Sequence, residues 1–328
     1  MTTFTLEQFQ TTTQTLQNEI GKVIVGQNEL IRNALIAIIS GGHVLLEGVP
    51  GLGKTLLIRT MAEALDLQFN RIQFTPDLMP ADIIGTELLH EDEHGKRFFK
   101  FRPGPIFVNL LLADEINRAT PKTQSALLQV MQEKIVTVAG QTYKLEPPFF
   151  VLATQNPIEM EGTYPLPEAQ LDRFMFKLNM RFPDVHELVK ILERTTQDNE
   201  HHASTATDGA TLLQMGHLAR QIPVASHVNT YVAQLLLATH PEQLGSPDMV
   251  KRYVRFGASP RGAQAIILGA KVNALFNQRY NVAFSDVQAV VHAALRHRLI
   301  LNFEGEAEGI RVDQIISNLI ETMPQPNS

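Results

Sequence analysis

The stretch that decides the fold reads His43-Val44-Leu45-Leu46-Glu47-Gly48-Val49-Pro50-Gly51-Leu52-Gly53-Lys54-Thr55-Leu56. Residues 43–47 are a short apolar run typical of a strand, and residues 56–65 have a helix-forming composition. Between them, two glycines that enclose four residues are followed by Lys and Thr, which is the spacing of a phosphate-binding loop. The alternative is a Gly/Pro turn with a chance Lys-Thr pair, and the flanking strand and helix make it the weaker interpretation.

Each residue type in this loop has a chemical task. Small residues let consecutive backbone N–H groups close around phosphates, and the helix that follows turns its N-terminal dipole toward the same anions. The Lys54 ammonium neutralises the terminal phosphates, and the Thr55 hydroxyl ligates Mg²⁺. The sequence therefore predicts that a nucleoside triphosphate is bound with Mg²⁺ by Gly48, Val49, Pro50, Gly51, Leu52, Gly53, Lys54, Thr55 and Leu56.

Composition limits the class of protein. A chain of 328 residues with 44% apolar and 19% charged residues is long enough for about two globular domains. A net charge of −6 gives no general attraction to nucleic acid or anionic membranes. The absence of Cys excludes disulfides, thiolate catalysis and Cys-based zinc sites. With no leader-like start and no apolar run of ~18 residues, we expect a cytoplasmic protein without a membrane span.

Two carboxylates end the next apolar run. Residues 106–115 read as a buried strand that finishes in Asp114 and Glu115. Ligands bind at the carboxyl ends of strands in an open α/β sheet, so both side chains should face the phosphates. Asp114 is suited to hold Mg²⁺, directly or through water, and Glu115 is suited to orient and deprotonate the attacking water. Alone, such a pair is often a solvated turn; the phosphate-binding loop favours the functional interpretation.

Further strands and hairpins are indicated along the same half of the chain. Residues 149–156 form a buried strand that ends in Asn156, whose amide suits the hydrolytic water or the γ-phosphate, although Asn-Pro is also common turn chemistry. Residues 69–74 and 174–178 are the remaining strand candidates. Two inserts, residues 85–105 and 135–145, read as hairpins.

The segment before the second helix offers a candidate base contact. Val23 and Ile24 lead into Val25-Gly26-Gln27, an apolar strip that ends in Gly just before a helix at residues 30–39. Such a strip could lie against a purine ring. A plain strand-to-helix turn is an equally good interpretation of the sequence.

Beyond residue 183 the strands are expected to stop. Asp184 and Glu187 resemble a capping box, residues 196–209 read as a mobile polar loop, and the rest is helical in pattern. The helices are predicted at residues 212–220, 228–239, 262–276 and 287–300, the last opened by Ser285 and Gln288. Arg261 lies in the first turn of a helix, where a cation is disfavoured by the dipole, so we expect it to have an anionic partner.

Together these motifs resemble an AAA+ ATPase of the MoxR family, over nearly the whole chain. The resemblance is carried by residues 48–55, 114–119, 154–157, 165–174 and 259–262. It implies an α/β P-loop AAA+ core with a parallel five-stranded sheet in residues 1–182, followed by an all-α lid domain in residues 183–328. It also implies ATP and Mg²⁺ as cofactors.

The resemblance assigns roles to single residues. Asn156 looks like the sensor 1 residue, Arg173 like the arginine finger presented to a neighbouring subunit, and Arg261 like sensor 2. Residues 25–27 would pack the adenine. Two nearby arginines, Arg118 and Arg181, could compete with Arg173 for the finger role.

The same resemblance implies partners and an activity. Proteins of this family form rings, usually hexamers, in which ATP hydrolysis at subunit boundaries drives remodelling of a client. They are similar to chaperones that help to mature enzyme complexes or insert metals into them, often with a partner that carries a von Willebrand factor A domain.

Three other functions fit parts of the sequence. A nucleic-acid motor would carry the same inserts, but Ala139-Gly140-Gln141 is neutral and Glu91-Asp92-Glu93 is acidic, so that only Lys96 and Arg97 favour it. A nucleotide-gated scaffold would not need Glu115. A small-molecule P-loop kinase would need neither a distant Asn and Arg pair nor a long helical tail.

Overall fold

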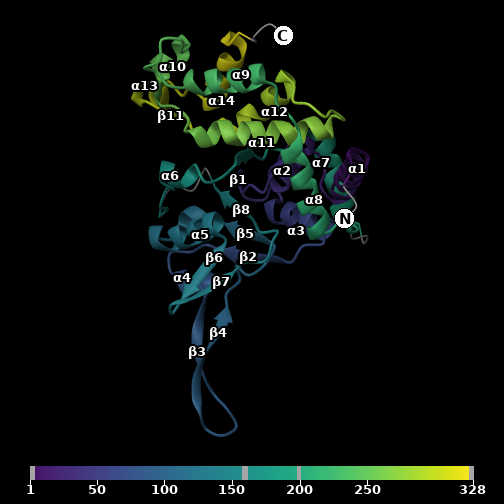
Figure 1. Cartoon of the computed structure of the whole chain (residues 1–328), viewed down its shortest axis with the longest axis vertical. Helices are drawn as coiled ribbons and strands as arrows, with labels where there is room; N and C mark the ends of the chain where they lie inside the picture. Colours follow the sequence, from purple (N-terminus) through teal and green to yellow (C-terminus); the bar gives the residue numbers. More distant parts are fainter. Residues whose placement is uncertain (1–3, 157–161, 198–200, 325–328) are drawn as a thin grey trace.

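A parallel sheet of five short strands, in the order β2-β5-β8-β1-β9, forms the centre of the molecule (Figure 1). The computed structural model describes residues 4–156, 162–197 and 201–324. The strands are β1 (Val44–Glu47), β2 (Phe69–Gln73), β5 (Leu110–Asp114), β8 (Phe150–Gln155) and β9 (Phe176–Asn179). The five-stranded parallel sheet expected from the sequence is confirmed.

One predicted strand begins later than expected. Residues 106–109 form turns in which the Ile106 N–H donates to the Ile83 carbonyl and the Val108 N–H to the Ile106 carbonyl. Ile106 is fully buried all the same. Its apolar character therefore reflects burial in the hydrophobic cluster that also contains Ile83 and Leu111, and the strand starts only at Leu110.

Both faces of the sheet are covered by apolar side chains. Along β1, for example, Val44 and Leu46 point into one cluster and Leu45 into the other. The first cluster includes residues of α1 (Leu6–Val23), α2 (Asn28–Ser40) and α3 (Lys54–Ala64); the second includes residues of α4 (Pro80–Ile84) and α5 (Pro121–Glu133). Double burial explains why the central strands are continuous apolar runs.

Strand order determines which loops meet. Because the strands are parallel, all five end at one edge, called here the carboxyl edge, and begin at the other, the amino edge. Since β8 lies between β1 and β5, the residues that follow β1, β8 and β5 are neighbours along the carboxyl edge.

The two inserts are hairpins, as predicted. The first pairs β3 (Gly85–Glu91) with β4 (Arg97–Pro103) and projects away from the C-terminal helices (Figure 1). The second pairs β6 (Ile135–Val138) with β7 (Gln141–Lys144). Phe101 of the first stacks on Tyr143 of the second with ring centroids 4.0 Å apart, so the two hairpins are packed together at their bases.

Residues 23–27 connect two helices. Val23 ends α1, Asn28 starts α2, and Gly26 and Gln27 between them have φ angles of +69° and +56°. The strand-to-helix turn considered from the sequence is therefore wrong. The left-handed backbone reverses the chain within two residues, which Gly26 permits because it has no side chain.

The C-terminal part is mainly helical, with a strand pair that the sequence pattern did not predict. Its elements are α7 (Val185–Thr195), α8 (Gly209–Gln221), α9 (Ser226–Leu237), α10 (Asp248–Tyr253), β10 (Val254–Phe256), α11 (Pro260–Phe276), α12 (Phe284–Leu295), β11 (Ile300–Leu301), α13 (Phe303–Ala307) and α14 (Val312–Thr322). The β10–β11 pair means that strands do not stop at residue 183. Short strands and helices of this kind carry too little periodicity to be recognised.

Two details of these helices differ from the prediction. The capping box of Asp184 and Glu187 is confirmed, but α12 starts at Phe284, where the Asp286 carboxylate accepts from the Ala283 N–H. Ser285 thus lies inside α12, and the cap assigned to Ser285 and Gln288 is wrong.

The polar segment before α8 lies against the core in its described part. The Ser204 N–H donates to the Glu19 carboxylate at 3.0 Å, and the Ala206 N–H donates to the Ala64 carbonyl at 2.8 Å. Residues 201–208 are therefore held by α1 and α3, which contradicts the mobile loop expected there. Residues 198–200 lie outside the described residues.

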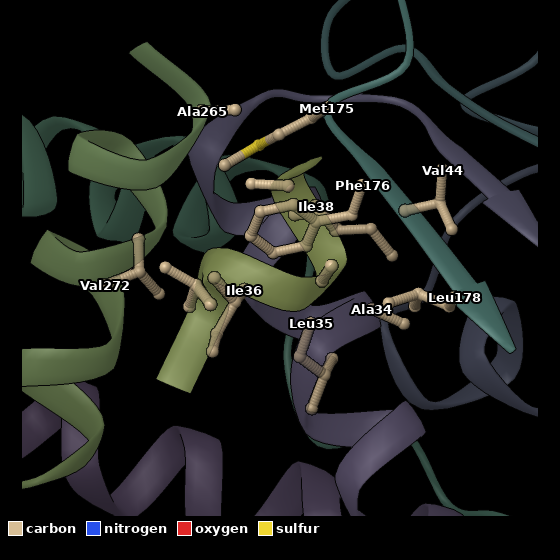
Figure 2. Close-up of a cluster of buried hydrophobic side chains, with 14 of the residues drawn as sticks. Ala34, Leu35, Ile36, Ile38, Val44, Met175, Phe176, Leu178, Ala265 and Val272 are labelled. Atoms are coloured by element: carbon tan, nitrogen blue, oxygen red, sulfur yellow. The ribbon is translucent and has the colours of Figure 1, made fainter. Parts of the chain in front are cut away.

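The helix α11 packs directly on the sheet. Phe176 of β9 is fully buried beside side chains of α2 and α11 (Figure 2). A Cβ added at Gly269 of α11 would lie 2.7 Å from Phe176 Cζ, so only glycine allows this approach. The C-terminal helices and the sheet thus share one core, and the domain boundary at residues 182/183 stays a prediction.

His43 joins three elements at the amino edge. The Val151 N–H donates to Nδ1 at 3.0 Å, so Nε2 carries the proton and donates to the Met131 carbonyl at 3.0 Å. Burial lowers the pKa of His43 from 6.5 to about 4, and the imidazole is therefore neutral at pH 7.

We expect Phe176→Ala to lower the free energy of unfolding by about 3–5 kcal/mol, because it leaves a cavity between the sheet and α11. Phe303→Ala is the matched control: Phe303 is 86% exposed, and its loss should change stability by less than about 0.5 kcal/mol. Urea denaturation measures both. Equal losses in the two variants would mean that α11 is not anchored by Phe176.

Stability should also depend on pH through His43. The pKa of His43 in the folded state lies below its value in the unfolded state, so between pH 6.5 and 4 only the unfolded state takes up the proton, and the free energy of unfolding decreases as the pH is lowered through that window. From pH 7 to 5 the parent should lose about 2 kcal/mol more than His43→Gln, which cannot be protonated. Urea denaturation at the two pH values tests this, and equal losses would contradict a buried neutral imidazole.

Candidate active site

The glycine-rich loop connects β1 to α3 at the carboxyl edge, as the sequence predicts. Gly51 and Gly53 have φ angles of +85° and +83°, a conformation that suits glycine. Lys54 begins α3, and its Nζ donates to the Gly48 carbonyl at 2.6 Å. The N-terminus of α3 therefore opens onto the loop, where N–H groups and the dipole favour an anion.

A cavity of 330 Å³ lies beside this loop. Val25 and Gln27 line it on one side, and the loop residues Gly51, Leu52, Gly53 and Leu56 line it on another. The structure thus brings the predicted base contact and the phosphate-binding loop to one pocket. Gly26 lies next to them in the chain, between residues that line the cavity.

Part of this pocket was not predicted. Phe182, and Leu188 and Ile191 of α7, complete its apolar wall. The helix α7 has no buried residue among its eleven, although it is strongly amphipathic. An apolar stripe on a helix that does not pack against the core was therefore the feature of the sequence that could have indicated this wall of the pocket.

Asp114 ends β5 almost fully buried, with an exposure of 7%. Thr154 Oγ1 donates to Asp114 Oδ1 at 2.5 Å, and Arg71 donates to Oδ2 from Nη2 at 2.6 Å and from Nε at 3.0 Å. These three donors compensate the buried charge.

Glu115 has a left-handed backbone, with φ of +55°, and its N–H donates to Thr154 Oγ1 at 2.8 Å. Its Oε2 accepts from Gln73 Nε2 at 2.7 Å and lies 3.1 Å from Arg118 Nε. A non-glycine residue in this region is strained, and such strain often accompanies function. The partners Arg71, Gln73 and Thr154 were not identified from the sequence. Arg71 and Gln73 are alternate polar residues on β2, which was the available signal for them, and Thr154 lies on β8.

Asn156 follows β8 and is 4% exposed. The strand order places it between the phosphate-binding loop and the carboxylates of β5. The adjacent Pro157 of the predicted motif lies outside the described residues.

The donor set suits Mg²⁺. The Thr55 hydroxyl and the Asp114 carboxylate are hard oxygen ligands, and Mg²⁺ in nucleotide sites keeps several of its waters. Asp114 can therefore act through water while it keeps the hydrogen bond from Thr154.

Two predicted arginines lie at the opposite edge. Arg173 precedes β9, and its Nη1 donates to the Leu128 carbonyl at 2.7 Å. Arg261 Nη1 lies 3.4 Å from Asp172 Oδ2, which is the anionic partner expected for it. Both arginines line a cavity of 260 Å³ with Gly42 and His43, which precede β1. The four residues of β1, roughly 13 Å in length, separate this cavity from the phosphate-binding loop of the same chain.

The two alternative candidates for the arginine finger, Arg118 and Arg181, lie at the carboxyl edge. Arg118 pairs with Glu115, and Arg181 forms an ion pair with Glu187 of α7 beside the apolar pocket. Both are thus engaged next to the chain's own site.

Comparison with known proteins agrees with this geometry. The family model described as "ATPase family associated with various cellular activities (AAA)" matches residues 43–176, and the AAA lid domain model matches residues 247–319. The chain is 45% identical to Chaperone MoxR1 of Mycobacterium tuberculosis over 94% of this chain and 82% of that protein. It is 32% identical to Protein MoxR of Methylorubrum extorquens over 94% of both chains.

A solved structure shows the same fold. The crystal structure of a candidate ATPase from Cytophaga hutchinsonii has a TM-score of 0.90 and 41% identity, over 98% of this chain and 97% of that one. In the described residues of our chain, no helix is long and apolar enough to cross a membrane.

These relatives match in sequence along almost the whole chain, and the fold and the phosphate-binding loop agree with them. Nucleotide binding and ATP hydrolysis are general properties of such proteins. The chain belongs to the MoxR family of AAA+ ATPases.

Proposed function

We propose that this protein hydrolyses Mg-ATP at sites shared between neighbouring copies in a hexameric ring and uses the energy to remodel client proteins.

 The observation behind this proposal is that the predicted nucleotide-binding and catalytic residues are divided between the two edges of one sheet. The phosphate-binding loop, Asp114 and Glu115 lie at the carboxyl edge, and Arg173 and Arg261 lie at the amino edge.

The carboxyl edge would bind the nucleotide and activate water. Lys54 and the N–H groups at the start of α3 would hold the phosphates, and the cavity beside Val25 would take the adenine. Thr55 and Asp114 would hold Mg²⁺, which supplies neutralising charge when bound. Glu115 would accept a proton from the water that attacks the γ-phosphate, and Asn156 would orient that water, so that the β–γ phosphoanhydride bond breaks.

The amino edge would complete the site of the next copy. A head-to-tail contact places different edges of two identical chains together, and repetition of that contact closes a ring. In such a ring Arg173 and Arg261 would face the γ-phosphate bound by the neighbour, and their charge would stabilise the transition state. We propose Arg173 as the finger because Arg118 and Arg181 are engaged at the opposite edge of the sheet.

The client is proposed to be a protein complex. The similarity to Chaperone MoxR1 supports a chaperone-like role. The first hairpin exposes a cross-strand pair, Leu89 and Phe99, which are 58% and 68% exposed and suit contact with protein. Cytoplasmic maturation of an enzyme complex, with metal insertion as one form of it, and a partner with a von Willebrand factor A domain, are proposed from the family resemblance.

A nucleic-acid motor is the second candidate, because the first hairpin also carries Lys96, Arg97, Lys100 and Arg102. Stimulation of ATP turnover by DNA or RNA would favour it, and stimulation by a client protein alone would favour the chaperone.

Glu115→Gln should retain ATP binding and lose at least ~100-fold in turnover, because the variant keeps the size of the side chain and lacks the base. The control is Glu63→Gln on α3, whose side chain is partly exposed and pairs with Arg59, and which should leave turnover unchanged. Calorimetry measures binding, and phosphate release measures turnover. Normal hydrolysis by Glu115→Gln would show that the water is activated elsewhere.

Arg173→Ala should bind ATP nearly as well as the parent and lose turnover by a factor on the order of 10³. Lys54→Ala should fail to bind ATP, because the charge that offsets the terminal phosphates is lost. An equal mixture of the two should recover activity, since some boundaries join an intact loop from one chain to an intact Arg173 from the other.

Subunit exchange is the control for that mixture and can be verified with differently labelled parent chains. If the chains exchange and activity does not recover, Arg173 acts within its own subunit, and the shared site is refuted.

A further inference from the structure

Two further arginines, Arg220 and Arg298, line the same amino-edge cavity as Arg173 and Arg261. Arg220 lies near the end of α8, Arg261 in the first turn of α11, and Arg173 in the turn before β9. Neither the sequence motifs nor the mechanism above uses Arg220.

The cavity carries an excess of positive charge. Asp172 is the only acidic side chain among its lining residues in the described structure. Its carboxylate already accepts from Ser259 Oγ at 2.8 Å and from Arg298 Nε at 2.8 Å, and Arg298 is 7% exposed. The one negative charge of Asp172 is thus shared between the buried Arg298 and Arg261, whose Nη1 lies 3.4 Å from Oδ2, and Arg173 and Arg220 face no further carboxylate among the described lining residues.

The guanidinium of Arg220 has weak contacts within the chain. Its Nη2 lies 3.5 Å from the Ser40 carbonyl, at the limit of a hydrogen bond, and the structure records no ion pair between Arg220 and a described carboxylate. The backbone carbonyl of Arg220 accepts from Lys271 Nζ at 2.9 Å. Burial, with a smaller contribution from the Arg220 charge, lowers the pKa of Lys271, in keeping with the local excess of cations.

The backbone that carries Arg220 is fixed in position. One turn before it, a Cβ added at Gly216 would lie 2.8 Å from the Ile39 carbonyl oxygen, so α8 packs closely on the end of α2. Leu212 and Met215 of α8 are buried in the core. The guanidinium is therefore presented beside residues 40–42 by a helix that cannot easily move away.

We propose that Arg220 contacts the terminal phosphates of the nucleotide bound by the neighbouring copy, as a third arginine beside Arg173 and Arg261. The inference rests on the proposed function, because it requires the shared site. A planar guanidinium is suited to phosphate oxygens, and a cavity lined by four arginines and a single carboxylate favours an anion of more than one charge.

The test compares Arg220→Ala and Arg220→Lys with the parent. Arg220→Ala should bind ATP within about 2-fold of the parent and lose turnover by about 10²-fold, the cost of one electrostatic contact to a transition state. Arg220→Lys keeps the positive charge and lacks the paired N–H donors of the guanidinium. Its turnover should therefore lie between that of the parent and that of Arg220→Ala. Arg255→Ala, an exposed arginine on β10, is the matched control and should keep full turnover.

Mixing distinguishes a contact in the neighbour's site from a structural role. An equal mixture of Arg220→Ala and Lys54→Ala should recover activity, as expected for Arg173→Ala and Lys54→Ala. Recovery with Arg173→Ala but not with Arg220→Ala would overturn this inference and leave the proposed function intact. If neither mixture recovers activity, both this inference and the proposed shared site are refuted.

Two further outcomes would also overturn the inference. Full turnover by Arg220→Ala would show that the phosphate does not meet this side chain. Loss of assembly, measured by light scattering with ATP, would show that Arg220 pairs with an acidic side chain of the neighbour instead.

Discussion

The parallel pairing of β1 with β8 and β9 is the constraint on which the rest of the structure depends. Parallel neighbours end at one edge, so the loop after β1, the carboxylates of β5 and Asn156 after β8 meet there. The same pairing sends the residues before β1 and β9, including Arg173, to the other edge. A sheet whose strands are four to six residues long therefore separates the phosphate-binding loop and the carboxylates from the arginines that we propose to contact a neighbour's phosphates.

Burial of charge determines how the carboxyl edge is built. A carboxylate as enclosed as Asp114 is costly unless it is paired, and Thr154 and Arg71 provide the partners. Thr154 also accepts from the Glu115 N–H, so one hydroxyl positions both acidic residues. At the amino edge the balance is opposite, because Asp172 is the one carboxylate in the described cavity lining and already pairs with Arg298 and Arg261, which leaves Arg173 and Arg220 without a carboxylate partner there.

The sequence predicted the parts of this design that repeat a local pattern. The phosphate-binding loop, the central strands, both hairpins and the main helices have the expected glycines or periodicity. Arg71, Thr154 and Arg220 could not be found this way, since each acts through residues distant in the chain. The conformation of Val23 was also not predicted. The sequence around it resembles a strand, but Val23 ends the helix α1, which packs on the core.

The proposed function depends on one nucleotide being held by two copies of the chain. The most direct measurement is a structure of Glu115→Gln assembled with Mg-ATP. We expect the phosphate-binding loop of one chain to contact each triphosphate from one side and Arg173 of the next chain to contact it from the other. A triphosphate completed by a single chain, with Arg173 distant from every phosphate, would contradict it.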